Sequence, residues 1–594
     1  MSTQAHIRPI VRAREPSQTI LEAAMSHGCT PLQARVLASR LPENVAPDIG
    51  RWIEPRLSQL DSPWLLPDIE PAVEAIVAAI TSPDRMLALV VDHDADGSSA
   101  LAVMWTALVD VFGLPEHRVM RFLSHRMKEG YGVSDALTDR ILAACPAPSL
   151  IITADQGSTD EARFARLVEH GHEVVVSDHH EIPEAGPPAS ALACVNPTRD
   201  DSRFPDRYVA GCHVAWLVMC AVRARLIERG HLDTATPTLA GLLDYVAVGT
   251  TADAVSFARS VNNRAIVAYG LSLMNLRPRP AWQAYRALVN KDGRFTARDI
   301  SHGIAPRVNA RSRLGDAMLG ADYLCADTVA EASRLVMILD AANQQRKEIE
   351  KGLLADAQAA CERQYGRPAR VIHLPNGHAG VHGIVASRIV EATARPTVCF
   401  SPKEGHAGVL TGSLRSVPGV HLRDALAWVQ HALGDCPISF GGHAMAAGCL
   451  IREEDLPRFT AAFGRAITIQ HPLIHDQVPI VWTDGALGRA PGFTELEEIE
   501  ALEPYGRDFD APVFEDEFLV AQARPVGDGS HLKLALVASD GAPVDAIWFR
   551  ALEPGGPAPV QPGRKARLAY SVDRNEFRGR VSVNLIVQAM GGDG

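Results

Sequence analysis

Three carboxylates stand at alternate positions directly after an apolar run. Residues 87–109 read LALVVDHDADGSSALAVMWTALV, which places Asp92, Asp94 and Asp96 on one short loop followed at once by Gly97. Like charges this close repel, so the carboxyl groups hold protons more tightly unless a cation is bound. A solvated acidic turn is the simpler interpretation of an isolated DxDxD segment. The other polar side chains of the sequence decide between a turn and a metal site.

Further acids and imidazoles follow three more apolar segments. They are Asp155 in ITADQG, Asp178, His179 and His180 in SDHH, and Asp253 in TTADAV. The runs SLIIT and EVVVS, which precede the first two, have the length and composition of buried strands. Parallel strands covered by helices end at one edge of their sheet, and ligands bind at that edge. The sequence therefore predicts at least four carboxylates and two imidazoles on one rim.

The donor types of this cluster indicate divalent cations. Oxygen and imidazole donors without thiolates favour Mn²⁺ or Mg²⁺ over a structural zinc. Enough donors are present for two ions, which lie roughly 3.5–4 Å apart in hydrolytic sites. The sequence offers no G-x-S-x-G elbow, and no phosphate-binding glycine loop follows the first strand. We therefore expect metal-assisted hydrolysis, with Gly97 letting the backbone turn tightly so that the aspartates converge.

Alternating strand and helix patterns must position these residues. Residues 86–270 repeat strand, loop and helix, with Ser98 as the expected N-cap of the first helix, which predicts a parallel sheet between helices. Residues 326–363 are rich in Ala, Leu, Glu, Lys and Gln, so one long helix is expected. An α/β pattern resumes over 368–470. Alternation after about residue 512 predicts a small antiparallel β-barrel or sandwich.

The overall composition limits the classes of protein to which the chain can belong. A chain of 594 residues is too long for one ordinary core, so two to four domains are expected. Its apolar runs are far shorter than a membrane span. Ten scattered cysteines without a CxxC pair, and an N-terminus without an apolar signal segment, predict a cytoplasmic protein. The net charge of −12 does not exclude a nucleic-acid partner, because a local basic strip still binds phosphate.

The motifs DHDADG, ADQG, SDHH and TTADAV, in this order, resemble the DHH phosphoesterase superfamily. Later segments are similar to the RecJ exonuclease family, among them HRMKEGYG, VNPTRDDSRFPDRYVAG, APRVNARSRLGDA, GHAGVHGIVASR, GSLRSVPGVHLRDAL and FGGHAMAAG. The resemblance runs from about residue 30 to 590, and the ordered series is much more specific than any single motif.

The resemblance implies an α/β protein of five parts. They are an N-terminal helical segment (1–75), a DHH-type parallel-sheet domain with the metal site (76–325), a connecting helix (326–365), a smaller DHH-associated α/β domain that binds substrate phosphate (366–475) and an OB-like β-barrel that binds nucleic acid (476–594).

The resemblance also implies a role for each member of the cluster. The metal ligands would be Asp94, Asp96, Asp155, His179 and Asp253, with Asp155 bridging two divalent cations, Mn²⁺ in preference to Mg²⁺. The remaining catalytic residues would be Asp92, which supports the first ion, Asp178, which orients the adjacent imidazole, and His180, which faces the scissile phosphate.

A second set of residues is implied to bind the substrate. It consists of Arg126, Arg307, Asn309, Ser413, Arg415, Gly441, Gly442 and His443. Within it, Arg126, Ser413 and Arg415 match a pocket for the terminal 5′-phosphate, so that the metals reach only a linkage near that end. An ordinary surface salt bridge is the alternative interpretation of each arginine.

The implied activity is that of a single-stranded-DNA-specific 5′→3′ exonuclease that releases 5′-mononucleotides in DNA recombination and repair. The implied partners are single-stranded DNA, a single-strand-binding protein and a helicase, with the chain a monomer away from membranes. Two alternatives stay open, a DHH-family phosphodiesterase acting on short oligonucleotides, cyclic dinucleotides or polyphosphate, and a non-catalytic replication scaffold. The β region beyond residue 510 favours long single strands. The chain departs from commoner family residues at His93, Gln156, Arg311 and His382, none of which is a matched ligand.

Overall fold

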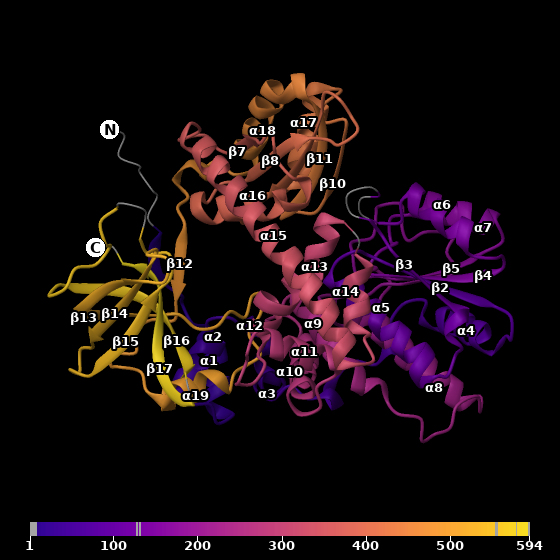
Figure 1. The fold of residues 1–594 in the computed structure, drawn as a ribbon, viewed down its shortest axis with the longest axis horizontal. Helices are drawn as coiled ribbons and strands as arrows, with labels where there is room; N and C mark the ends of the chain where they lie inside the picture. Colours follow the sequence, from indigo (N-terminus) through magenta and orange to yellow (C-terminus); the bar gives the residue numbers. More distant parts are fainter. Residues whose placement is uncertain are drawn as a thin grey trace.

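The computed structural model describes residues 9–125, 129, 132–315, 317–552, 556–577 and 579–591. Three lobes are arranged around one long helix, α15, with the N-terminal helices lying beside the C-terminal barrel (Figure 1). Within the described ranges, no helix combines the length and the apolarity that crossing a lipid bilayer requires.

The first lobe is built on a five-stranded parallel sheet. Its strands are ordered β3-β2-β4-β5-β6, where β2 is Met86–Val91, β3 Val119–Leu123, β4 Ser149–Ala154, β5 Glu173–Ser177 and β6 Ala193–Val195. Alternate side chains of β2 enter two different cores. Leu87, Leu89 and Val91 pack in the core shared with the N-terminal helices, whereas Ala88 and Val90 pack on the other face. This two-sided burial explains why β2 reads as a continuous apolar run.

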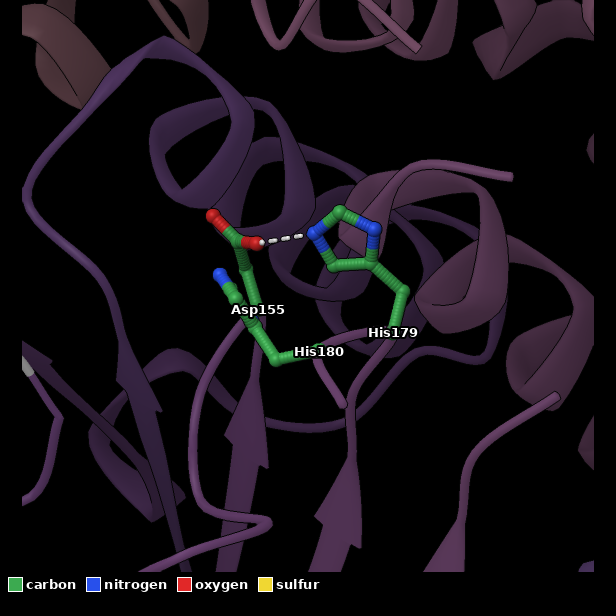
Figure 2. Close-up of side chains that lie close together, drawn as sticks. All are labelled: Asp155, His179 and His180. Carbon is green, nitrogen blue, oxygen red and sulfur yellow. Dashed lines mark ion pairs between the residues drawn. The ribbon is translucent and has the colours of Figure 1, made fainter. Parts of the chain in front are cut away.

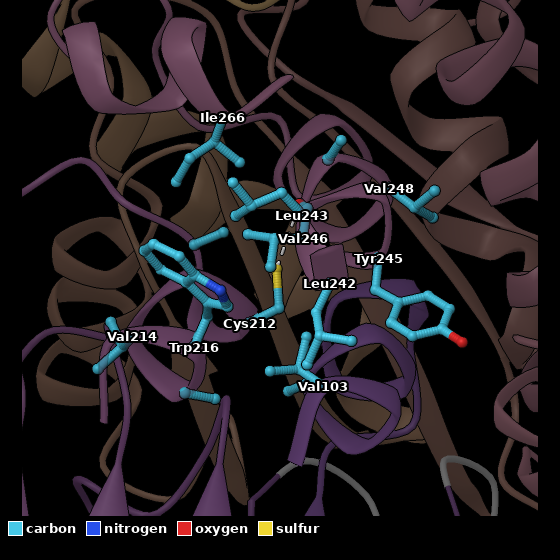
Figure 3. Close-up of a cluster of buried hydrophobic side chains, with 14 of the residues drawn as sticks. Val103, Cys212, Val214, Trp216, Leu242, Leu243, Tyr245, Val246, Val248 and Ile266 are labelled. Atoms are coloured by element: carbon cyan, nitrogen blue, oxygen red, sulfur yellow. Dashed lines mark hydrogen bonds between the residues drawn. The ribbon is translucent and has the colours of Figure 1, made fainter. Parts of the chain in front are cut away.

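Helices cover both faces of this sheet. Helices α4 (Ile69–Thr81), α5 (Ala95–Thr106) and α8 (Gly211–Glu228) supply one core, and α6 (Asp135–Ala144) and α7 (Glu161–Glu169) supply the other. Helices α9 (Leu243–Ala252) and α10 (Val261–Leu276) extend the first core. Figure 3 shows this packing, in which Val103 of α5, Trp216 of α8 and Val246 of α9 contribute to one cluster. The cluster fixes the start of α8 and the end of α9, which both reach the metal site.

The long helix predicted for residues 326–363 is confirmed as α15 (Val329–Glu362), whose N-cap Thr328 accepts a hydrogen bond from the backbone of Glu331. Its first half buries Leu335 and Leu339 in the core of the first lobe. Its second half buries Leu353 and Ala357 in a core of the second lobe. The helix is therefore a structural member of both lobes.

The second lobe is a smaller α/β unit. Its sheet has the order β10-β11-β9-β8-β7, formed by Ser439–Gly442, Ala446–Arg452, Val409–Arg415, Thr397–Pro402 and Arg370–His373. Strands β7 and β8 are parallel and the other neighbours are antiparallel. Helices α16 (Ala379–Thr393), α17 (Leu422–Leu433) and α18 (Leu456–Gln470) pack against this sheet.

The alternating C-terminal region forms a closed barrel rather than a sandwich, and the expectation of a wholly antiparallel sheet is wrong, because the third and fifth strands of the barrel in chain order pair in parallel. Its strands follow the order β13-β14-β15-β17-β16, comprising Phe514–Val526, His531–Val537, Pro543–Trp548, Lys565–Phe577 and Arg580–Met590. The barrel is preceded by α19 (Phe493–Glu500). Closure pairs both edges of the sheet, which removes unpaired strand edges.

The N-terminal segment is attached to the approach to the barrel. Strand β1 (Ile10–Ala13) pairs in parallel with β12 (Ile480–Thr483), and α1 (Gln18–Ser26) and α2 (Pro31–Ala38) follow β1. Just after α2, Arg40 donates two hydrogen bonds to Asp484, at 2.6 and 2.9 Å, and both side chains are almost fully buried. This ion pair ties the start of the chain to its last lobe.

Replacing Asp484 with alanine is expected to lower the free energy of unfolding by about 3–5 kcal/mol, because it leaves the guanidinium of Arg40 buried without its partner. Urea unfolding followed by circular dichroism measures the loss. The matched control is Asp510→Ala, which removes a 65% exposed partner of Arg14 and is expected to cost less than about 1 kcal/mol. Equal losses in the two variants would contradict the structural role of the buried pair.

Candidate metal centre

The loop after β2 is fixed by its own carboxylates. Asp94 is the N-cap of α5 and accepts hydrogen bonds from the backbone N–H groups of Asp96 and Gly97, at 2.8 and 3.2 Å. The expectation that Ser98 caps this helix is wrong, because the helix begins four residues earlier, where Asp94 supplies the acceptor. A Cβ at position 97 would lie 2.2 Å from the carbonyl oxygen of Asp92. Glycine is therefore required here by this close approach, without a left-handed turn.

Asp96 is held by the start of another helix. Its two carboxylate oxygens accept the backbone N–H groups of Gly211 and Cys212, at 2.7 and 3.0 Å, in the first turn of α8. The N-terminal end of a helix carries partial positive charge and offers unsatisfied N–H groups. This contact lets a fully buried carboxylate keep its place in a crowded acidic site. It was missed in the sequence, although AGCHVAWLV carries the signal of a helix start.

The structure brings together side chains from all four predicted segments. Their ligand atoms form three groups, each within 4.8 Å, namely Asp155 with His179 and His180, Asp96 with His179 and Asp253, and Asp92 with Asp94 and Asp155. Nε2 of His179 lies 3.2 Å from Asp155, 3.7 Å from Asp253 and 4.0 Å from Asp96. Figure 2 shows the imidazole of His179 directed at the Asp155 carboxylate. Asp155 and His179 each belong to two of the three groups.

The electrostatics of this cluster fit bound cations. Burial, together with the charges of Asp96 and Asp94, raises the pKa values of Asp155 and Asp253 well above their usual range. Burial and the neighbouring His180 lower the pKa of His179, which keeps its imidazole neutral. Nε2 of His179 is buried and finds no hydrogen-bond partner among the described residues. A neutral imidazole with an open nitrogen, surrounded by carboxylates, is the donor set of a divalent-cation site.

Asp178 lies behind the cluster and organises the two histidines. Its Oδ1 accepts the backbone N–H of His179 at 2.7 Å and lies 2.8 Å from Nδ1 of His180. Its Oδ2 accepts the backbone N–H of Ser158 at 3.0 Å. Burial would raise the pKa of Asp178, but His180 outweighs it and lowers that pKa below its usual range. Burial would likewise lower the pKa of His180, whereas the ion pair with Asp178 raises it to about 10.

A third polar group, Asp92 with His93 and Ser124, was not foreseen as a unit. Nδ1 of His93 lies 2.8 Å from Asp92 and 3.0 Å from Ser124, whose hydroxyl donates to Asp92 at 3.0 Å. Burial would raise the pKa of Asp92, but His93 outweighs burial and lowers it. Asp92 is therefore ionised beside Asp94, whose own pKa is raised by burial and by Asp92. The sequence feature that could have predicted this group is the histidine between two aspartates in the segment DHD, residues 92–94.

The predicted substrate residues are distributed over the two lobes. His443, after β10, lies opposite the first lobe, with its ring 6.0 Å from that of His180 and its Nδ1 3.4 Å from Glu181. Ser413 and Arg415 lie on β9, where the Arg415 guanidinium packs against Gly383 of α16. Arg126 lies outside the described residues.

Two further members of the substrate set lie on helix α13 (Ala305–Leu314). Arg307 pairs with Asp340 of α15 at 2.8 Å and donates to the carbonyl of Gly303 at 2.8 Å. Asn309 has a buried Oδ1 that accepts no hydrogen bond from the described residues.

The two glycines of β10 differ in whether the surrounding backbone requires a glycine at that position. Gly442 has a φ of +128°, and a Cβ there would lie 2.5 Å from the carbonyl oxygen of Ala446. A Cβ on Gly441 would meet nothing within 4 Å among the described residues, so protein packing does not require glycine at that position.

Comparison with known proteins gives three family-model matches along the chain. They are the DHH family N-terminal domain over residues 87–250, the DHHA1 domain over 369–468 and the RecJ OB domain over 492–589. The first contains the loop after β2 and the SDHH segment. The third covers the closed barrel. The parallel sheet, its rim of acids and imidazoles and these matches define a protein of the DHH class.

Full-length relatives define the family within this class. The single-stranded-DNA-specific exonuclease RecJ of Salmonella typhimurium is 35% identical over 97% of this chain and 98% of that protein. The RecJ of Escherichia coli K12 is 34% identical over 97% and 98%. The crystal structure of Thermus thermophilus RecJ with Mn²⁺ has a TM-score of 0.75 and 25% identity and covers 100% of this chain and 80% of that one. The Mg²⁺ complex of that protein has a TM-score of 0.71. The chain belongs to the RecJ family.

Proposed function

We propose that this chain is a metal-dependent exonuclease that hydrolyses single-stranded DNA from its 5′ end and releases 5′-mononucleotides in DNA recombination and repair. The observation that carries the proposal is the convergence of acids and imidazoles from four segments at one sheet edge, opposite His443 of the second lobe. Relatives named single-stranded-DNA-specific exonuclease match nearly the whole length, barrel included. A relative that acts only on short oligonucleotides, or a scaffold without ligands, accounts for these features less well.

The chain's own residues divide the work of hydrolysis. Two divalent cations held by Asp94, Asp96, Asp155, His179 and Asp253 would lower the pKa of a bound water and neutralise charge on the phosphoryl oxygens.

Two imidazoles complete the site. Asp178 keeps Nδ1 of His180 occupied, so that the protonated ring offers Nε2–H to a phosphate. His443, across the gap between the lobes, approaches the same position from the other side. The scissile phosphate is proposed to bind beside this pair, within reach of both imidazoles.

The 5′→3′ direction of hydrolysis follows from a pocket that binds the terminal 5′-phosphate of the strand. We assign Arg126, Ser413 and Arg415 to this pocket, with Arg307 and Asn309 lining the cleft and Gly441 and Gly442 next to the strand. A held 5′-phosphate leaves only the nearest linkages within reach of the metal centre.

We also infer the division of the chain that the resemblance implied, at residues 75, 325, 365 and 475, with the first boundary falling within α4 (Ile69–Thr81), which continues from the N-terminal segment into the sheet domain. The three family-model matches each fall inside one of these segments, and α15 lies within the connecting segment 326–365. Single-strand-binding protein and a helicase are the proposed partners of a monomer. The ten cysteines, all within the described ranges, are free thiols, which fits the proposed reducing cytoplasm.

Digestion of end-labelled DNA tests the proposed function. Single-stranded and double-stranded substrates, labelled at either end, are incubated with Mn²⁺, Mg²⁺ or EDTA. Single strands are expected to lose mononucleotides from the 5′ end with either metal, and duplexes and EDTA samples are expected to stay intact. Release from the 3′ end would overturn the assigned direction. Faster hydrolysis of a dinucleotide than of a long strand would favour the short-oligonucleotide alternative.

Replacing Asp178 with asparagine is expected to lower kcat by about 10- to 100-fold, because partners that orient metal ligands contribute on this scale. The affinity for Mn²⁺, measured by electron paramagnetic resonance, is expected to fall in parallel. Asp201→Asn is the matched control, since that carboxylate pairs with Arg199 at 2.7 Å in the same lobe but outside the cluster. Unchanged Mn²⁺ affinity and unchanged kcat in the Asp178 variant would contradict its positioning role.

A further inference from the structure

An exposed aromatic ring lies at the edge of the metal centre. Tyr208 is 42% exposed and stands on the loop between β6 and α8. The backbone carbonyl of the next residue, Val209, accepts a hydrogen bond from the imidazole of His179, and Gly211 donates its N–H to Asp96. The residues that contact these two metal-ligand candidates therefore stand one and three positions after Tyr208, and consecutive Cα atoms are only about 3.8 Å apart.

Arg259 supports one face of this ring. It follows Asp253 by six residues, so the segment that carries it also starts at the metal centre. Its guanidinium carbon lies 5.5 Å from the ring centroid of Tyr208, and its Nη1 donates to the Tyr208 hydroxyl at 3.2 Å. A cation placed over one aromatic face fixes the ring. The exposed part of the ring remains available to stack against another planar group.

Buried hydrogen bonds hold the two loops together. The side-chain amide of Asn263 donates to the carbonyls of Tyr208 and Ser256, at 2.7 and 3.1 Å. Asp206 accepts the backbone N–H of Tyr208 at 2.9 Å and the hydroxyl of Ser260 at 2.5 Å. Asp206, Ser260 and Asn263 are all buried. The backbone beneath Tyr208 and Arg259 is thus braced from both loops, which reduces the ordering cost of binding at this surface.

We propose that Tyr208 and Arg259 form a stacking platform for a nucleobase of the DNA strand that enters the metal centre. The proposal rests on the proposed function and adds a subsite to it. Every base presents a π-face, so an aromatic ring binds unpaired bases without regard to sequence. Unpaired bases are available only in a single strand, and a platform next to the metal centre would hold the nucleotides that follow the scissile linkage.

The surroundings favour a base over a phosphate group at this position. Arg259 also borders an open cavity of about 680 Å³, whose lining includes the carboxylates of Glu15, Glu43 and Asp508. These acids disfavour an approaching phosphate by like-charge repulsion, whereas a neutral base is unaffected. The exposed charge of Arg259 is already shared between the Tyr208 hydroxyl and Asp508. The available surface is therefore the aromatic face.

A scan with abasic sites tests the platform. Oligothymidylates with a 5′-phosphate, each carrying one abasic residue at a different position from the 5′ end, are bound to the full chain in EDTA, and the affinity is measured by fluorescence anisotropy. One position is expected to lower affinity by roughly 5- to 100-fold, the range of base–aromatic stacking. In Tyr208→Ala, the intact strand is expected to bind that much more weakly, and the penalty at that position is expected to disappear.

Kinetics and control variants separate stacking from folding effects. Tyr208→Ala is expected to raise KM with little change in kcat, because the platform does not touch the reacting linkage. Tyr208→Phe keeps the ring and is expected to retain most of the affinity. Tyr365→Ala, at a 72% exposed tyrosine beyond the end of α15, is the matched control and should leave both constants unchanged.

Three outcomes are informative. A nuclease whose Tyr208→Ala variant keeps the wild-type KM and the wild-type abasic profile would overturn the platform while leaving the proposed function intact. Loss of kcat in Tyr208→Phe and Tyr208→Ala alike would assign the tyrosine to the chemistry instead and would also overturn the platform. Absence of strand cleavage and of strand binding by the wild-type chain would overturn the proposed function itself.

Discussion

Replacing Asp155 with asparagine is expected to lower the rate of single-strand hydrolysis by at least about a thousandfold, since loss of a residue that only orients a metal ligand already costs about 10- to 100-fold. Asp155 belongs to two of the three groups of ligand atoms, so its loss disrupts the sites of both cations. Asparagine keeps the shape of the side chain but supplies one neutral oxygen in place of a carboxylate. Single-turnover hydrolysis with Mn²⁺ measures the effect.

A second measurement distinguishes this effect from damage to the fold. Burial and neighbouring carboxylates raise the pKa of Asp155, so removing its charge relieves repulsion, and the Tm of the metal-free variant is expected to rise. Asp244→Asn is the matched control, because Asp244 is buried at the opposite end of α9 from Asp253 and binds Arg279 and Trp282. That variant is expected to keep its activity and to lose stability. Full activity in the Asp155 variant would refute the two-cation site.

Removal of divalent metal is expected to abolish hydrolysis and to lower the Tm of the chain. A ligand that binds only the folded state stabilises it by mass action, and the cluster has no preformed counterpart in the unfolded chain. EDTA treatment followed by titration with Mn²⁺ or Mg²⁺ measures both changes by calorimetry and by strand digestion. Calcium, which is bound by oxygen donors at longer distances, serves as the comparison ion. An identical Tm with and without Mn²⁺ would contradict this expectation.

The stabilisation by metal is expected to depend on pH with a definite sign. The pKa values of Asp155 and Asp253 are raised in the folded, metal-free chain, mainly by burial and then by neighbouring carboxylates. Their protonated forms therefore stabilise the metal-free fold at low pH, and this contribution is lost as the pH rises through the raised pKa values. Cations bind the deprotonated groups. The difference in Tm between Mn²⁺-loaded and EDTA-treated protein should accordingly widen as the pH rises above the usual titration range of a carboxyl group.

The placement of the acids could be predicted from the sequence because parallel strands end at a common edge. Asp92, Asp155 and Asp178 follow β2, β4 and β5, which are neighbours in the sheet. Once each apolar run was interpreted as a buried strand, the three loops had to meet. The long helix was equally accessible, because a helix of 34 residues leaves a clear pattern of composition.

Contacts between distant segments could not be predicted in this way. The N–H groups of Gly211 and Cys212 reach Asp96 only because α8 begins beside α5, which no local pattern encodes. The pairing of Arg307 with Asp340 depends on how α13 packs against α15. The start of α5 was misplaced because Asp94 and Ser98 are both good cap residues, and the choice between them is made by tertiary contacts of the loop.

The long helix α15 also determines how far the two lobes stand apart. Its first half belongs to the core of the first lobe and its second half to a core of the second. A continuous helix curves only gently unless proline, a glycine pair or a bulge interrupts its hydrogen bonds. A rigid rod, rather than a flexible tether, therefore keeps the rings of His180 and His443 at 6.0 Å. The two lobes therefore approach each other beside the metal centre too closely to admit a duplex between these rings, since the major groove of a duplex alone is about 12 Å wide. Double-stranded DNA is then excluded by the fixed separation of the two lobes before any phosphodiester bond is hydrolysed.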